Sequence, residues 1–443
     1  MPGRLPGSEK QPRVANGVRS YMVIALGILV REWRMGRSAA AGPRDGEIVH
    51  GTGPAFRRRV RTGASSPGVR VRSRRSVMAF ACPDHPLSGT LDLLAPHVPP
   101  ALVPAPAWGA VRAAAARLPA ALAAAAYLEC RLGEAGGPVD LIVRVDAAGR
   151  EVLAGRTPAV PLPAPLRDDP AWGRLAALCR RWADAPGPAW RRVRRLWLEF
   201  DLAETGGAET VPAPSLFLAL DPEADPAEVE ALLREAGDAV LPGGVPPADR
   251  EAVLRVLARR PAGSRVPYLG LLAGRAGAPP RVYLSGVGTA GLAAALEAAG
   301  WPGPAGEVEE VLAALGGEAP PPVGMIHVDA REDAPPRLGV ELTLARPCQR
   351  RGEIAERGFL DRLAELGLCT PARREALSRW PGAELRTLPH ELWPSRVERR
   401  VNCVKLGFEP GRPLHAKAYL LATPHPVRAR AAGVFPARPA STG

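Results

Sequence analysis

The sequence RVNCVKLGF at residues 400–408 is followed by HAKAYLL at 415–421, and together these segments predict a β-hairpin. Apolar and polar residues alternate in both, as in strands with one buried face. Four similar pairs precede this one, and helical stretches separate each pair from the next. The other predicted pairs are 139–145 with 151–155, 196–202 with 215–221, 266–272 with 281–284, and 325–329 with 337–344. Ten strands in five hairpins predict one closed sheet.

The alternation gives the predicted sheet one apolar face and one polar face. Helices with apolar stripes must cover the apolar face, so the polar face turns inward when the sheet closes. The alternative is an open sheet with its polar face in solvent, which leaves two strand edges to protect. The predicted fold class is therefore α+β: a ten-stranded antiparallel β-barrel of five helix–hairpin–helix (αββα) repeats, with helices outside and a polar lumen.

Helical stretches fill the segments between the predicted hairpins. An Ala-rich stretch at 108–130 predicts the helix that opens the series. We expect a lead-in segment at 78–107, a barrel domain at 108–423 and a disordered tail at 424–443. The later predicted helices are 170–183, 226–236, 247–259, 289–299, 306–315, 354–366 and 371–378.

The basic charge of the chain is concentrated near its start. Residues 1–77 contain 16 Lys and Arg against 4 Asp and Glu, a net of +12, whereas the whole chain has a net charge of +13. This segment is rich in Gly, Ser, Pro and Arg and has no long periodic pattern, which predicts a disordered extension or a mis-assigned start. Its apolar stretch at 21–30 is too short to span a bilayer. We expect no nucleic-acid partner and no membrane span.

The cysteines and histidines do not form a recognisable metal motif. The six cysteines have no C-x-x-C spacing, and the seven histidines are scattered. We therefore expect no metal site, no cofactor and no disulfide framework, and a reducing cytoplasmic location. The abundance of Ala, Arg, Gly and Pro indicates a GC-rich bacterial source.

A cation and a tyrosine two residues apart occur twice on predicted inward faces, as Arg281-Val282-Tyr283 and Lys417-Ala418-Tyr419. Lys405 lies on the hairpin partner of the second pair. Such cations can hold an anion such as diphosphate, and tyrosine rings can face a neighbouring cation. The ordinary alternative is that each cation forms a structural ion pair.

Carboxylates share the predicted lumen with these cations. Glu199 is the leading candidate to orient a bound nucleophile and accept its proton, although it can equally neutralise a nearby arginine. The other candidate lumen residues are Arg144, Asp201, Tyr268, His327, Asp329, Arg337, Glu341 and His415.

This architecture, with the Arg281-x-Tyr283 and Lys417-x-Tyr419 pairs, resembles the ABBA-type aromatic prenyltransferases over roughly residues 108–423. The resemblance implies metal-independent transfer of an isoprenyl group from an allylic diphosphate to an aromatic small molecule or peptide, in specialised metabolism. It further implies that Arg281, Lys405 and Lys417 bind the diphosphate, that Tyr283 and Tyr419 screen the allylic cation, and that Glu199 positions the acceptor.

Two other functions are compatible with the sequence. A barrel of the same shape can bind a small molecule or peptide without catalysis. Alternatively, the basic extension can be the working part of an interaction protein. The sequence does not identify the acceptor, the isoprenoid length or the oligomeric state.

Overall fold

The computed structural model describes residues 85–427, apart from 134–136, 185–186, 203–210, 222–223, 276, 289–290, 317–320, 332–335 and 389–393. The chain separates into two units, Met1–Ser76 and Val77–Gly443, and every described residue belongs to the second. The predicted extension at 1–77 and residues 428–443 of the predicted tail therefore lie outside the described residues.

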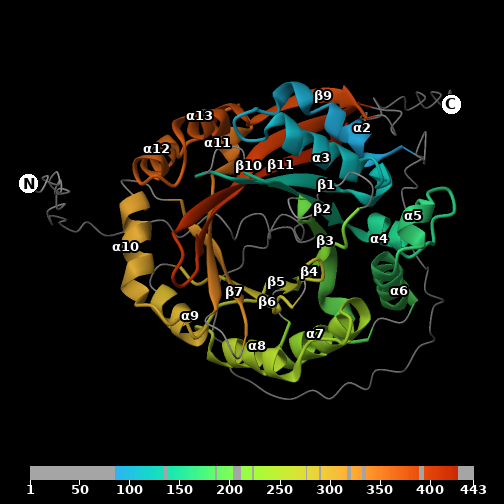
Figure 1. Cartoon of the computed structure of the whole chain (residues 1–443), viewed down its shortest axis with the longest axis horizontal. Helices are drawn as coiled ribbons and strands as arrows, with labels where there is room; N and C mark the ends of the chain where they lie inside the picture. The colour runs from blue at the N-terminus through green and yellow to red at the C-terminus, as the bar shows by residue number, and fades with distance from the viewer. Residues whose placement is uncertain are drawn as a thin grey trace, which may run out of the picture. The chain divides into compact units, whose positions relative to one another are not determined.

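The second unit is built around one antiparallel sheet that closes on itself (Figure 1). Its last strand, β11 (His415–Pro426), pairs along one edge with β10 (Pro394–Phe408) and along the other with β1 (Ala125–Arg131). The remaining barrel strands follow in chain order: β2 (Val139–Val145), β3 (Val193–Phe200), β4 (Ser215–Leu220), β5 (Tyr268–Leu271), β6 (Arg281–Ser285), β7 (Val323–Asp329) and β8 (Arg337–Thr343). The predicted ten-stranded antiparallel barrel is confirmed.

One further strand lies outside the ring. β9 (Gly382–Thr387) pairs with the first part of β10, which is long enough to extend past the barrel. β9 was not predicted from the sequence. Residues 424–426 were predicted to belong to the tail, whereas they continue β11.

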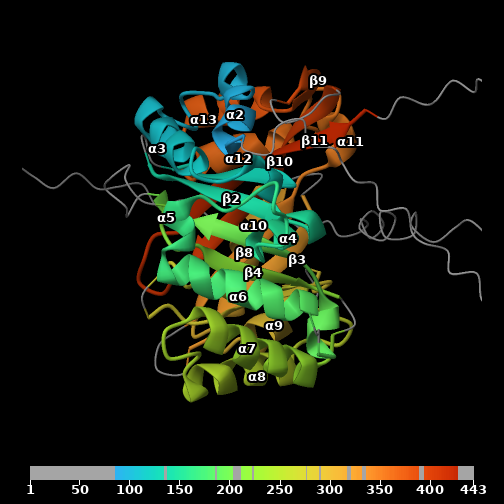
Figure 2. The same ribbon diagram turned by 90° about the vertical axis from the view of Figure 1, so that its right-hand side faces the viewer.

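Helices surround the barrel and separate successive strand pairs (Figures 1 and 2). α7 shows why they begin where they do: Asp225 caps the backbone of Glu228, the Glu228 side chain caps Asp225 in return, and Pro226 occupies the first turn. The helices are α2 (Leu87–Asp92), α3 (Ala105–Ala115), α4 (Ala147–Leu153), α5 (Ala164–Arg167), α6 (Pro170–Asp184), α7 (Pro226–Val240), α8 (Pro247–Arg259), α9 (Leu292–Ala298), α10 (Ala305–Gly316), α11 (Arg346–Gln349), α12 (Arg357–Glu365) and α13 (Pro371–Arg379).

The first predicted hairpin was right in one half and wrong in the other, since 139–145 is the strand β2 but 151–155 is not its partner. The segment 151–155 is not a strand, because Asp146 caps the start of α4 by accepting from the Ala148 and Gly149 amides. The predicted helix at 108–130 ends at Ala115, and the true partner of β2 is β1. The Ala-rich composition favours a helix locally, but pairing with β2 and β11 fixes residues 125–131 as a strand.

The outward face of the barrel carries the apolar residues that the alternation assigned to it. Leu141, Leu198, Leu218 and Val340 are fully buried in one continuous core with the covering helices. Where α6 crosses β3, the ring of Trp172 stacks on that of Phe200, with the ring centroids 6.1 Å apart. The predicted orientation of the two faces is confirmed.

No helix among the described residues is both long enough and apolar enough to cross a membrane.

Phe200→Ala is predicted to lower the free energy of unfolding by about 3–5 kcal/mol, because it leaves a cavity between β3 and α6. Urea unfolding measures this change. Leu385→Ala is the matched control, since the Leu385 side chain on β9 is 65% exposed, and a change within about 0.5 kcal/mol is expected. Equal effects of the two substitutions would contradict the packing of α6 on this face.

Candidate functional site

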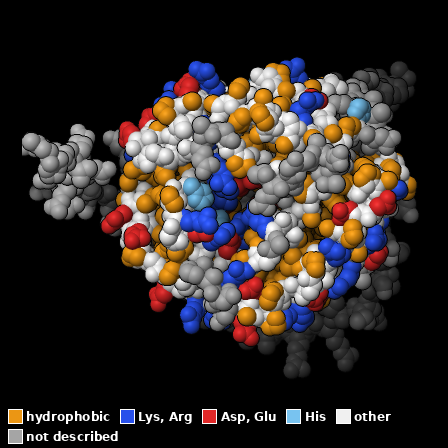
Figure 3. Space-filling model, viewed as in Figure 1, with side chains coloured by type: hydrophobic (Ala, Val, Ile, Leu, Met, Phe, Trp, Pro, Cys, Tyr) orange, Lys and Arg blue, Asp and Glu red, His pale blue; other side chains and the backbone are white. Residues whose placement is uncertain are grey.

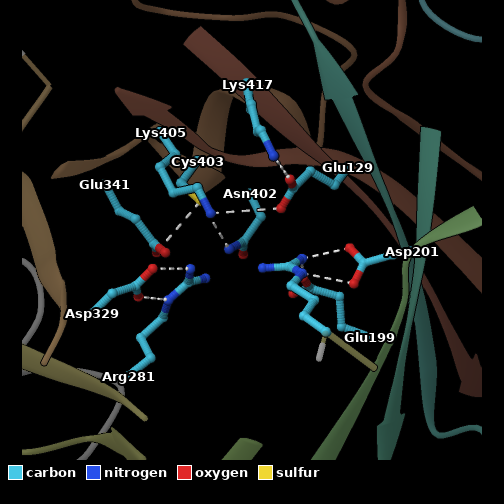
Figure 4. A network of polar contacts seen from close by, with 11 residues as sticks. Glu129, Glu199, Asp201, Arg281, Asp329, Glu341, Asn402, Cys403, Lys405 and Lys417 are labelled. Atoms are coloured by element: carbon cyan, nitrogen blue, oxygen red, sulfur yellow. Dashed lines mark hydrogen bonds and ion pairs between the residues drawn. The ribbon is translucent and has the colours of Figure 1, made fainter. Parts of the chain in front are cut away.

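The inward face of the barrel brings charged side chains from several strands and one connecting segment into the lumen (Figure 4). In the space-filling view, Lys, Arg and His side chains gather around a hollow over the middle of the barrel (Figure 3). Most of the carboxylates and cations predicted for this face are buried there. The buried ones are Glu199, Arg281, His327, Asp329, Glu341 and Lys405.

Two lysines face each other across neighbouring strands. Lys405 on β10 is the register partner of Lys417 on β11. Between them lies the carboxylate of Glu129, from β1. Lys417 Nζ donates to Glu129 Oε1, and Lys405 Nζ lies 3.6 Å from Oε2. Burial alone would raise the pKa of Glu129, but the charges of Lys405 and Lys417 hold it well below its usual value.

Glu129 was missed because the Ala-rich segment around it was predicted to be a helix. A signal was present, since Tyr127, Glu129 and Arg131 alternate with Leu128 and Cys130 as strand residues do. Its register partner on β11 is Tyr419. Lys405 Nζ also lies over the ring of Tyr419, 5.1 Å from the ring centroid. The predicted Lys405–Lys417–Tyr419 cluster therefore exists, with an added anion at its centre.

The third predicted cation, Arg281, is bound by a carboxylate on the next strand. Its Nη2 lies 2.9 Å from Oδ2 of Asp329, and its Nε also donates to this carboxylate. Arg281 and Asp329 are register partners on β6 and β7. This forked contact fixes the direction of the guanidinium in the lumen.

A second carboxylate cluster lies on β3 and just beyond it. Arg275, in the segment between β5 and β6, donates from Nη2 to Glu199 Oε1 at 2.6 Å and from Nε to Asp201 Oδ2 at 2.7 Å. Burial, with the nearby charge of Glu129, raises the pKa of Glu199 although Arg275 opposes this. Arg275 was missed because the alternation rule gives no side-chain direction in a connecting segment.

Two further buried carboxyl groups have raised pKa values. Burial raises the pKa of Glu341 against the opposing charge of Lys405, and its Oε2 lies 3.7 Å from Cys403 Sγ. Asp140 on β2 has a pKa of about 7, because of burial and then the charge of Glu129. A β-bulge between Val401 and Cys403 turns the amide of Asn402 toward the same space (Figure 4).

Aromatic rings line the part of the lumen wall that the charged side chains do not occupy. Ring centroids are 5.1 Å apart between Tyr127 and Trp197, 6.3 Å between Trp197 and Tyr268, and 5.6 Å between Tyr268 and Tyr283. His327 continues the wall, 5.3 Å from Tyr283. Burial, followed by the charge of Arg281, lowers the pKa of His327 well below its usual value, so its ring is neutral.

Four of the five tyrosines in the sequence are therefore inside the barrel, at positions 127, 268, 283 and 419. Several buried polar atoms on this wall have no hydrogen-bond partner among the described residues. They include Trp197 Nε1, Ser215 Oγ and His327 Nδ1. An unsatisfied buried donor or acceptor is costly, so these atoms favour a ligand that hydrogen-bonds to them.

Three predicted lumen residues lie apart from the clusters. The Arg337 side chain is 60% exposed and pairs with Glu409 at 3.0 Å. His415 is exposed, with its ring against Gly407. Arg144 lies level with Trp197 on the next strand and donates to the Ala124 carbonyl oxygen at 3.2 Å. Among the residues described, no group of three or more His, Cys, Asp or Glu is placed to hold a metal ion.

The chain is similar in structure to solved aromatic prenyltransferases. Prenyltransferase PriB, solved with L-tryptophan and dimethylallyl thiolodiphosphate, is 18% identical over 77% of this chain and 99% of its own, with a TM-score of 0.42. 5-Dimethylallyl tryptophan synthase from Streptomyces coelicolor is 18% identical over 80% and 99% of the two chains, with a TM-score of 0.40. AnaPT from Neosartorya fischeri is 13% identical over 68% and 78%, also with a TM-score of 0.40.

The expected resemblance to ABBA-type aromatic prenyltransferases is thus confirmed as a structural similarity. No protein-family model matches the sequence, and no curated protein matches it. At these identities and TM-scores the similarity transfers no residue role to this chain, so the chemistry of the lumen rests on its own side chains.

The protein is predicted to lose stability as the pH rises from 5 to 8, and Asp140→Asn to lose less. Folded Asp140 keeps its proton up to a pKa of about 7, whereas the unfolded chain releases it near pKa 3.9. This contribution is complete below pH 4 and is lost as the pH passes 7. We expect the decrease in the free energy of unfolding between pH 5 and pH 8 to be about 2 kcal/mol smaller in Asp140→Asn than in the wild type.

Urea unfolding at the two pH values measures this difference. Glu365→Gln is the control, since Glu365 is an exposed residue on α12, and it is expected to leave the fall unchanged. An Asp140→Asn protein that loses as much stability as the wild type would contradict the assignment.

Proposed function

We propose that this protein transfers an isoprenyl group from an allylic diphosphate to an electron-rich aromatic acceptor inside its barrel. The observation that carries the proposal is the juxtaposition, on inward faces, of cations with aromatic rings. Lys405 lies over Tyr419, Lys417 and Tyr419 share a face of β11, and Arg281 and Tyr283 share a face of β6. This arrangement suits a reaction in which an anion leaves and a carbocation forms beside it.

The donor end of the site is assigned to Lys405, Lys417 and Arg281. In the reaction the bond between the allylic carbon and the diphosphate oxygen breaks, and its electron pair leaves with the diphosphate. Charge-assisted hydrogen bonds from the three cations stabilise that developing charge. They take the part that a metal ion plays in other diphosphate sites, so we expect transfer to continue in EDTA.

The aromatic wall is assigned the roles of stabilising the allylic cation and binding the acceptor. Burial raises the pKa of Tyr283 and Tyr419 well above the usual tyrosine value, so both remain neutral phenols whose ring faces attract an allylic cation. Trp197 and Tyr268 offer surfaces against which a planar acceptor can pack. The acceptor carbon then bonds to the allylic carbon.

Glu199 is assigned the role of accepting the proton that the aromatic acceptor loses. Its raised pKa makes it a better proton acceptor near neutral pH than an ordinary glutamate. Arg275 holds one of its oxygens at 2.6 Å and so fixes the direction of the carboxylate. Arg275 is in this scheme a positioning residue, absent from the sequence prediction.

Non-catalytic binding is the second candidate function, and the ion pairing of the lumen favours it. Arg281 is paired with Asp329, and both lysines are paired with Glu129. A lumen whose cations already have partners suits a ligand of low net charge. Such a protein would bind a small molecule or peptide and show no turnover.

A cytoplasmic location belongs to the same proposal. The five cysteines in the described part of the chain are all free, which supports a reducing compartment.

Lys417→Ala is predicted to lower kcat/KM for the donor by about 100-fold, because one of the cations facing the leaving group is removed. The assay uses full-length protein, dimethylallyl and geranyl diphosphate, and a panel of indoles, phenols and tryptophan-containing peptides in EDTA, read by mass spectrometry. Arg379→Ala is the control, since that side chain is 76% exposed on α13. Ligand binding without any isoprenyl product would leave the non-catalytic function instead.

Tyr283→Phe is predicted to keep activity within about threefold, whereas Tyr283→Ala is predicted to lose at least about tenfold in kcat. The ring face, which phenylalanine retains, is the part assigned to screening the cation. Single-turnover kinetics with saturating donor separates this effect from donor binding. Equal losses in the two variants would assign the effect to the hydroxyl group and exclude a role for the ring face.

A further inference from the structure

Lysine is almost absent from this chain. The sequence contains lysine only at positions 10, 405 and 417, although Lys and Arg together number 58. The two lysines of the barrel are direct register partners on neighbouring strands, with Lys405 6% exposed and the Lys417 side chain 15% exposed. Like charges directly opposite each other in a sheet repel, and burial strengthens the repulsion. A neighbouring negative charge is therefore needed to stabilise this pair of buried cations.

Glu129 performs that task. It is 2% exposed, it comes from the strand on the other side of β11, and its two oxygens face the two ammonium groups (Figure 4). Removing it would leave two buried cations without their shared counter-charge, which is strongly destabilising. Its carboxylate thus stands where an anionic ligand of the two lysines would stand.

Glu129 contacts the two lysines unequally. Oε1 accepts a hydrogen bond from Lys417, but Oε2 lies 3.6 Å from Lys405 Nζ, beyond the usual N–H···O range. Lys405 is therefore compensated by charge without a close hydrogen bond to Glu129. A larger anion with more oxygens can reach both ammonium groups at once, which the short side chain of Glu129 does not achieve.

We propose that Glu129 is an internal counter-anion that competes with diphosphate for Lys405 and Lys417 and thereby sets the affinity of the barrel for its donor. The proposal rests on the proposed function, because it assumes that these lysines receive a diphosphate. When diphosphate arrives, Glu129 must give up its ion pairs beside a second anion. The protein keeps its buried lysines compensated in the free state and binds the donor more weakly as a result.

The test measures binding of inorganic diphosphate to the full chain by titration calorimetry. Glu129→Gln is expected to bind at least about tenfold more tightly than the wild type, a difference of about 1.4 kcal/mol in binding free energy. Glu341→Gln is the matched control, because Glu341 is equally buried and is the register partner of Lys405 on β8, yet it contacts Cys403. It is expected to change the affinity by less than about threefold.

The outcomes separate this proposal from the proposed function. Wild-type binding that Glu129→Gln leaves unchanged or weakens overturns the counter-anion and leaves the donor site intact. Binding only by Glu129→Gln supports the counter-anion and overturns donor binding by the wild type. Equal gains in Glu129→Gln and Glu341→Gln assign the effect to general lumen charge and overturn the specific role. Binding by neither protein overturns the anion site itself.

A second pair of variants covers the case in which Glu129→Gln does not fold. Lys417→Gln leaves Glu129 with Lys405, whereas Glu129→Gln combined with Lys417→Gln places two neutral amides side by side and frees Lys405. The double variant is expected to bind diphosphate at least about tenfold more tightly than Lys417→Gln alone. Equal affinities would overturn the proposal.

Discussion

The pairing of β11 along both of its edges is the constraint on which the rest of this structure depends. It closes the sheet into a barrel. The outer face of the barrel packs against the surrounding helices, and the inner face lines an enclosed lumen. Strand alternation places ionic side chains on that inner face, and burial then requires each of them to have a partner. The chemistry of the site follows from how that requirement is met.

The partners come from different strands, and in one place from a connecting segment. Arg281 is held by Asp329 of the neighbouring strand, Arg275 reaches the β3 carboxylates from the segment between β5 and β6, and Glu129 serves two lysines. Each cation that can attract a ligand therefore already has a competitor. Ligand affinity in such a site depends on the difference in energy between the ion pairs within the free protein and those that the cations form with the ligand. The number of positive charges alone does not determine it.

Alternation made the barrel part of β10, β11 and the other regular strands predictable, and it placed Lys405, Lys417 and Tyr419 on one face correctly. It failed at β1, whose alanines suggest a helix and whose strand conformation comes from pairing with the nearby β2 and with β11, which lies far along the chain. Because β1 was not predicted, Glu129 and Tyr127 were not recognised as lumen residues. Arg275 was missed for another reason, because no periodic pattern fixes the side chains of a connecting segment.

Closure also orders events during synthesis. β1 is among the first strands to leave the ribosome and β11 is the last, yet Ala126 and Ala422 are register partners. One edge of β1 stays unpaired until β11 has been made, and such an edge can pair with another chain. Contacts between residues so far apart in the sequence make folding slow. Protection of that edge until β11 emerges would favour closure of the ring over association between nascent chains.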